Sequence, residues 1–137
     1  MGNTAFHLND LSRMDFRTSA TADQKNSELQ QSLHLDYRYQ PARIAIGLSL
    51  SNPQPPRVPA DVLGKPIRGE TLFGQEDVDL ALWLTLLSQH AGVVSPSRKQ
   101  VADLVAGHWA RGVEMLVKAS FGNEAHPQDF LAGYATR

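Results

Sequence analysis

The segment from Asn52 to Pro59 restricts the fold more than any other part of this 137-residue chain. Four of its eight residues are prolines, at positions 53, 55, 56 and 59. Because proline lacks an amide donor and disfavours helix in the residue before it, this stretch cannot be helical, and we expect an extended, semi-rigid connection. It separates two helical pairs, but neither half has enough apolar residues for its own core. We therefore expect a single domain over residues 1–137.

Composition narrows the possible classes of function. Hydrophobic residues make up 42% of the chain, which is enough for a core that buries about two thirds of the unfolded surface. The absence of cysteine excludes disulfides, thiolate catalysis and cysteine zinc sites, and it fits a reducing compartment. The N-terminal residues lack the basic start and apolar run of a signal peptide, and no apolar run reaches the roughly 20 residues that span a membrane. We expect a protein of the cytoplasm.

The pattern of apolar residues predicts a mainly α fold. Alternation from Met14 to Ser19, with Met14, Phe16 and Thr18 on one side, predicts a short N-terminal strand. Helical spacing predicts four helices, over 20–34, 41–51, 75–90 and 96–120. The predicted organisation is an irregular arm (1–13), a strand-helix-helix unit (14–51), a Pro/Gly-rich connector (52–75), a helical pair (76–120) and a tail (121–137). This is a compact helical domain whose N-terminal half is like a ribbon-helix-helix protein.

Two of the predicted helices have apolar stripes that should pack against each other. The short turn from Ala91 to Ser95 predicts that the helices over 75–90 and 96–120 are antiparallel neighbours. The predicted core residues are Leu80, Trp83, Leu84, Leu87, Leu104, Val105, Trp109 and Leu116. Leu82 and Leu86 widen the first stripe, and the helix over 41–51 is apolar nearly all round. One neighbour cannot cover so much apolar surface, so we expect a homo-oligomer.

The run from Gly64 to Gly74 begins like a nucleotide-binding loop. Gly64 and Gly69 have the required spacing, but the motif then needs a lysine that reaches the phosphates. Glu70 occupies that position, and its carboxylate would repel phosphate. We therefore predict a rigid basic connector in which Glu70 is structural, either as a partner of Arg68 or as a cap of the following helix.

No other pattern indicates catalysis, a metal or a cofactor. No two of the five histidines are three or four residues apart on a helix, as a compact metal site requires. The serines, including Ser49, lack the Gly-x-Ser-x-Gly context and have no base nearby in the sequence. His108 lies on the apolar stripe of the last helix, which favours a core or interface histidine over a catalytic base. We expect no enzymatic activity and no cofactor.

Charge is unevenly distributed, although the formal net charge is only −1. From Arg38 to Gly69 there are five cations and one anion, Asp61, whereas Glu76 to Arg137 has seven anions and five cations. A locally basic segment of this kind can contact phosphate. The predicted DNA-contacting residues are Arg43, Arg57, Lys65 and Arg68, with Arg17 and Lys25 as further candidates.

Two specific runs carry a resemblance to a known family. They are Gly-Glu-Thr-Leu-Phe-Gly at 69–74 and His-Trp-Ala-Arg-Gly at 108–112, beside helical runs at 43–50 and 82–87. Over residues 16–118 the chain resembles the DndE family, the small component of bacterial DNA phosphorothioation systems. The resemblance implies a helical homo-oligomer, a tetramer, that binds DNA and prefers nicked duplex. It assigns the sulfur chemistry to partners: a cysteine desulfurase, an iron–sulfur protein and an ATPase.

Three functional interpretations remain open at this stage. The first is a non-catalytic DNA-binding subunit of a phosphorothioation assembly. The second is a helical scaffold of that assembly with little DNA affinity of its own. The third is a ribbon-helix-helix transcriptional repressor, which needs an exposed basic strand pair. A single basic face favours the first, and arginines paired to carboxylates favour the second.

Overall fold

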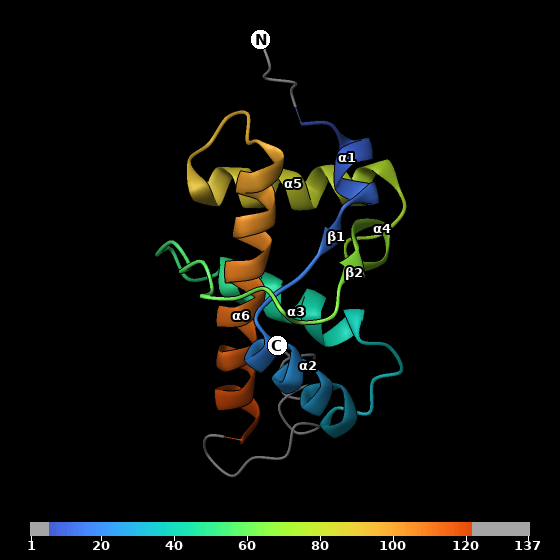
Figure 1. The fold of residues 1–137 in the computed structure, drawn as a ribbon, viewed down its shortest axis with the longest axis vertical. Helices are drawn as coiled ribbons and strands as arrows, with labels where there is room; N and C mark the ends of the chain where they lie inside the picture. Colours follow the sequence, from blue (N-terminus) through green and yellow to red (C-terminus); the bar gives the residue numbers. More distant parts are fainter. Residues whose placement is uncertain (1–5, 122–137) are drawn as a thin grey trace, which may run out of the picture.

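A computed structural model describes residues 6–121 (Figure 1). In chain order its elements are α1 (Leu8–Arg13), β1 (Asp15–Phe16), α2 (Ala20–Ser32), α3 (Tyr39–Leu50), β2 (Ile67–Arg68), α4 (Gly69–Leu72), α5 (Asp77–Ala91) and α6 (Arg98–Phe121). The fold is therefore mainly α with a short strand near the N-terminus, which confirms the predicted class. Helices α2, α3, α5 and α6 lie within two residues of their predicted bounds.

Helix α6 forms the long axis of the molecule, and its main partner is α3, which crosses its middle (Figure 1). The two backbones touch at this crossing. A Cβ atom built on Gly112 would lie 1.9 Å from the carbonyl oxygen of Ala45. Both Ala45 and its neighbour Ile46 are fully buried. Only a residue without a side chain permits this approach, so Gly112 sets the distance between α3 and α6.

The predicted antiparallel packing of α5 on α6 is wrong. Helix α5 lies across one end of α6, and its other neighbours are α1 and α3 (Figure 1). Five of the eight predicted core residues are buried: Leu80, Leu87, Val105, Trp109 and Leu116. Trp83, Leu84 and Leu104 are only partly buried, and the Trp83 ring packs on Phe73, with centroids 5.4 Å apart. Helical spacing reveals which face is apolar, but it does not reveal which element covers that face.

The predicted arm and connector contain short elements that the sequence pattern did not show. Helix α1 occupies part of the arm over 1–13, and its Leu11 is fully buried. The connector over 52–75 contains β2 and α4. The helices of these segments, at four and six residues, are too short for a periodic stripe. The predicted tail lies almost entirely outside the described residues.

Strand β1 pairs with β2 of the same chain in antiparallel register, with Asp15 opposite Arg68 and Phe16 opposite Ile67. The predicted alternation is confirmed, since Phe16 and Thr18 are buried whereas Asp15 and Arg17 are exposed. The strand is shorter than the predicted alternation from Met14 to Ser19. Ser19 instead caps α2, where its Oγ accepts a hydrogen bond from the amide of Ala22 at 3.0 Å. The likeness to ribbon-helix-helix proteins stays a prediction.

The His-Trp-Ala-Arg-Gly run joins α6 to three other segments. The buried Trp109 indole donates from Nε1 to Asn26 Oδ1 on α2 at 3.1 Å. The guanidinium of Arg111 donates to the carbonyl oxygens of Ser49 and Gln54, at 2.9 and 2.7 Å. The start of the proline-rich segment is thereby tied to α6.

Replacing Gly112 by alanine should destabilise the fold, because the new methyl group forces the α3 and α6 backbones apart. Overpacking of this kind costs about 1–3 kcal/mol or more in the free energy of unfolding, measured by urea denaturation. Gly92→Ala is the matched control. It has a positive φ of 71° but nothing within 4 Å of the added Cβ, so its cost should stay near about 1 kcal/mol. Equal losses for the two variants would contradict the backbone contact.

Candidate nucleic-acid interface

The β1–β2 ladder carries exposed cations on its solvent side. Phe16 and Ile67 face the core, whereas Arg17 and Arg68 lie on the exposed positions, and Lys65 precedes β2 with its side chain exposed. We call Arg17, Lys65 and Arg68 the basic ribbon. They come from segments about fifty residues apart in the chain, so only the pairing of the two strands brings them together.

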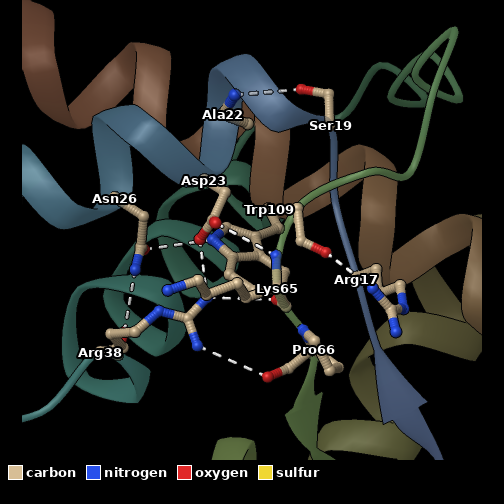
Figure 2. Close-up of polar contacts among 10 residues, drawn as sticks. Arg17, Ser19, Ala22, Asp23, Asn26, Arg38, Lys65, Pro66 and Trp109 are labelled. Carbon is tan, nitrogen blue, oxygen red and sulfur yellow. Dashed lines mark hydrogen bonds and ion pairs between the residues drawn. The ribbon is translucent and has the colours of Figure 1, made fainter.

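A clamp between α2 and α3 fixes one end of the basic ribbon (Figure 2). Arg38 Nη2 donates to Asp23 Oδ1 at 2.6 Å and to the carbonyl of Lys65 at 3.1 Å, and Nη1 donates to the carbonyl of Pro66 at 3.4 Å. Asp23 Oδ2 accepts a hydrogen bond from the Lys65 amide at 3.1 Å. The clamp holds the backbone of Lys65 on both sides and leaves its ammonium group in solvent.

Gly64 lets the ribbon approach α2 closely. Its amide donates to the Thr18 carbonyl at 3.0 Å, and its carbonyl accepts from Arg17 Nη1 at 3.1 Å. A Cβ atom at this position would lie 2.8 Å from the Cβ of Asp23 and 2.9 Å from the Thr18 carbonyl oxygen. The buried Thr18 hydroxyl in turn donates to the Ala106 carbonyl at 2.9 Å. The ribbon is thus held in one position on α6.

The carboxylate of Asp61, the single anion of the basic segment, accepts hydrogen bonds from backbone amides. Its Oδ1 accepts from the amides of Ala20 at 2.9 Å and Leu63 at 3.1 Å. These hydrogen bonds, that from Ala20 first, lower the pKa of the Asp61 carboxyl. Its negative charge therefore sits at the N-terminus of α2, where the helix dipole favours it.

The structure separates the other three predicted DNA-contacting residues from the ribbon. Arg43 donates to the carbonyls of Leu72 and Thr71 at 2.7 and 3.1 Å, so its guanidinium is used within the fold. Lys25 forms an ion pair with Glu114 of α6. Arg57 is exposed and lines a groove of about 600 Å³ between the proline-rich segment and α6.

Arg38 belongs to the basic segment but is not among the predicted contacts, because its central position depends on the fold.

One carboxylate reduces the charge of the ribbon. Arg68 Nε lies 3.8 Å from Asp15 Oδ1, and both side chains are about half exposed. A solvent-exposed pair of this kind contributes about 0–1 kcal/mol, so a phosphate can compete for the guanidinium. The Glu70 side chain, in contrast, is exposed in the first turn of α4 and forms no ion pair or hydrogen bond with the described residues 6–121. The prediction that Glu70 clamps the connector is wrong, because Asp23, Arg38 and Arg43 do so.

Ser49 has a basic neighbour that the sequence did not reveal. Its Oγ lies 2.9 Å from His108 Nδ1 and accepts a hydrogen bond from Arg111 Nε at 2.8 Å, although 59 positions separate the serine from the histidine. Both Ser49 and His108 are fully buried, so no substrate reaches the hydroxyl. Burial, followed by the charges of His90 and Arg111, lowers the pKa of His108 to about 4. This histidine is neutral and joins α3 to α6.

Comparison with known proteins identifies the family. Residues 15–123 match the family model of the DNA sulphur modification protein DndE. The chain belongs to the DndE family. No curated protein and no solved structure matches it.

The DndE match includes both strands of the ribbon and the whole His-Trp-Ala-Arg-Gly run, and it begins after α1. Membership implies involvement in DNA sulphur modification. Within residues 6–121 no helix is long and apolar enough to cross a membrane. In the same range no three histidine or acidic side chains lie close enough together to hold a metal ion.

The buried His108 should make stability depend on pH in this DndE-family chain. Its folded pKa of about 4 lies below the ordinary value of 6.5, so between these values the unfolded chain binds a proton that the folded chain does not. The contribution of neutral His108 to the free energy of unfolding is therefore complete above pH 6.5 and is lost as the pH falls from 6.5 toward 4. Urea denaturation at several pH values should show that His108→Asn has a lower free energy of unfolding than wild type at pH 7. Between pH 7 and 4 this free energy should fall less in the variant than in wild type. Parallel losses would contradict this.

Proposed function

We propose that this chain is a DNA-binding subunit of a DNA sulphur-modification assembly and that it catalyses no reaction by itself. The observation that carries the proposal is the basic ribbon, whose three residues are exposed while the Asp23–Arg38 clamp fixes the backbone of Lys65. The family supports a role in DNA modification, and the ribbon supplies a surface for the DNA backbone.

The ribbon suits contact with phosphate rather than with base edges. Lysine and arginine neutralise backbone phosphates and release counterions, so binding should weaken as salt rises. Contacts to phosphate carry no sequence information, so the binding should tolerate changes in DNA sequence. Because the backbone beneath the cations is already ordered, little entropy is lost when DNA binds. The preference for nicked duplex is part of the proposal and rests on the family resemblance.

The proposal assigns the sulfur chemistry to other proteins. The chain has no cysteine that could carry a persulfide, Glu70 occupies the position of a phosphate-loop lysine, and the Ser49 hydroxyl is buried. A cysteine desulfurase, an iron–sulfur protein and an ATPase are the proposed partners, and the cytoplasm is the proposed compartment.

Reversing charge on the ribbon tests DNA binding. In the double variant Lys65→Glu/Arg68→Glu, affinity for a duplex should fall at low salt, since two phosphate contacts are lost and two repulsions are added. The plot of log affinity against log salt concentration has a negative slope, and this slope should become shallower by about 2. A mobility shift at several salt concentrations measures both quantities.

The matched control is Lys99→Glu/Lys118→Glu, which changes the net charge equally on exposed positions of α6. This variant should keep the wild-type slope. If both double variants weaken binding alike, general charge and not the ribbon attracts DNA, and the assignment of the site fails.

We also propose that the chain self-associates, and the supporting observation is an exposed apolar face on α5. Val78, Leu82 and Leu86 follow each other at four-residue spacing and are 79, 54 and 37% exposed. Side chains at this spacing form one helix face, and exposed apolar faces commonly bind protein. We propose that this face is where copies of the chain associate as a homo-oligomer, a tetramer by the family resemblance.

Charge placed on the α5 face should reduce self-association. Light scattering at micromolar concentration should give wild type the mass of an oligomer and Leu82→Glu/Leu86→Glu a lower mass, because burying a carboxylate in an apolar contact is unfavourable. Gln100→Glu, on an exposed position of α6, is the control and should keep the wild-type mass. A monomeric wild-type protein would exclude the proposed oligomer.

A further inference from the structure

Tyr37 presents an aromatic surface in the turn between α2 and α3. Its side chain is 60% exposed, although its ring stacks on that of Tyr39, with centroids 5.7 Å apart and an angle of 18° between the planes. Tyr39 therefore covers part of one face of the Tyr37 ring, and most of the Tyr37 side chain remains accessible to solvent. An exposed tyrosine of this kind has no role in the core.

The position of the Tyr37 ring is ordered in advance. Its amide donates to Gln40 Oε1 at 2.9 Å, and its carbonyl accepts from the Gln40 amide at 3.2 Å. The Tyr39 ring beneath it lies 4.9 Å from the guanidinium carbon of Arg43, which is itself bound to α4. A ring held from its backbone and from one face loses little freedom when a second flat group stacks on it.

The turn that carries Tyr37 is joined to the basic ribbon through the side chain of Arg38. Arg38, the next residue, contacts Asp23 and the carbonyl oxygens of Lys65 and Pro66, so the turn and the ribbon meet at the clamp. Single-stranded nucleic acid is bound by this combination, in which cations follow the backbone and aromatic rings stack on the bases. A base within an intact duplex is already stacked and cannot use such a ring.

We propose that Tyr37 stacks on an unpaired base of DNA whose phosphates lie on the basic ribbon. The proposal rests on the proposed DNA-binding function and adds a structural preference: DNA that exposes an unpaired base binds more tightly than intact duplex. The ligand is a nucleobase freed from pairing, whether in a gap or in a single strand.

Anisotropy titrations test the preference with three fluorescein-labelled probes of one sequence: an intact duplex, the same duplex with a short gap, and the single strand. For wild type the gapped duplex and the single strand should bind more tightly than the intact duplex. Tyr37→Leu should weaken binding to these two probes by about tenfold, the effect of losing one stacked base, and leave the intact duplex within about twofold. Tyr37→Phe keeps the ring and should behave as wild type.

A second measurement reports stacking directly. A 2-aminopurine base in the gap should lose fluorescence when wild type or Tyr37→Phe binds, and should lose less with Tyr37→Leu. If Tyr37→Leu weakens all three probes equally, or none, the stacking proposal is overturned while ribbon binding stands. If wild type binds no probe, the proposed function and this inference both fail. The loss of affinity in Tyr37→Leu is compared between the gapped duplex and the single strand. The probe with the larger loss identifies the source of the unpaired base that stacks on Tyr37.

Discussion

The backbone contact between Gly112 and Ala45 is the constraint on which the other parts depend. It brings α3 and α6 close enough for the Ser49–His108 contact and for Arg111 to reach the proline-rich segment. Three residues before Gly112 in α6, Trp109 binds Asn26, and Asn26 Nδ2 donates to the carbonyl of Arg38 at 3.0 Å. The clamp that orders the basic ribbon is thus connected to the helix crossing by two hydrogen bonds through the core.

A nearly neutral chain can keep a group of exposed cations because several of its anions are bound at other places in the fold, although Asp15 lies opposite Arg68 on the ribbon. Asp61 sits at the N-terminus of α2, Asp23 lies under Arg38, and Glu114 pairs with Lys25 on another face. The same pairing offsets the charge of Lys25. Net charge therefore says little about local potential here, since the fold decides which charges cancel and which remain in solvent.

Much of the secondary structure could be predicted because it depends on neighbours in sequence. Alternation through Phe16 and Thr18, the cap at Ser19 and the helical stripes of α5 and α6 all express local periodicity. Helices α1 and α4 are too short to show a period, and they form because Leu11 and Leu72 are buried against other elements. The sequence predicted α5 as the partner of α6, whereas the main partner is α3, because an apolar stripe does not specify which element covers it.

For the candidate site, the sequence alone determined that a basic, non-helical connector follows a proline-rich segment and that its phosphate-loop motif is incomplete at Glu70. These properties depend only on residue identity and spacing. Only the tertiary structure decided which cations are grouped on one strand pair and which have partners within the fold. Strand pairing placed Arg17 beside Lys65 and Arg68, whereas packing turned Arg43 inward to α4 carbonyls and paired Lys25 with Glu114. The physical reason is that charge interactions act through space over a few ångströms, and residues far apart in the chain reach that distance only in the folded state.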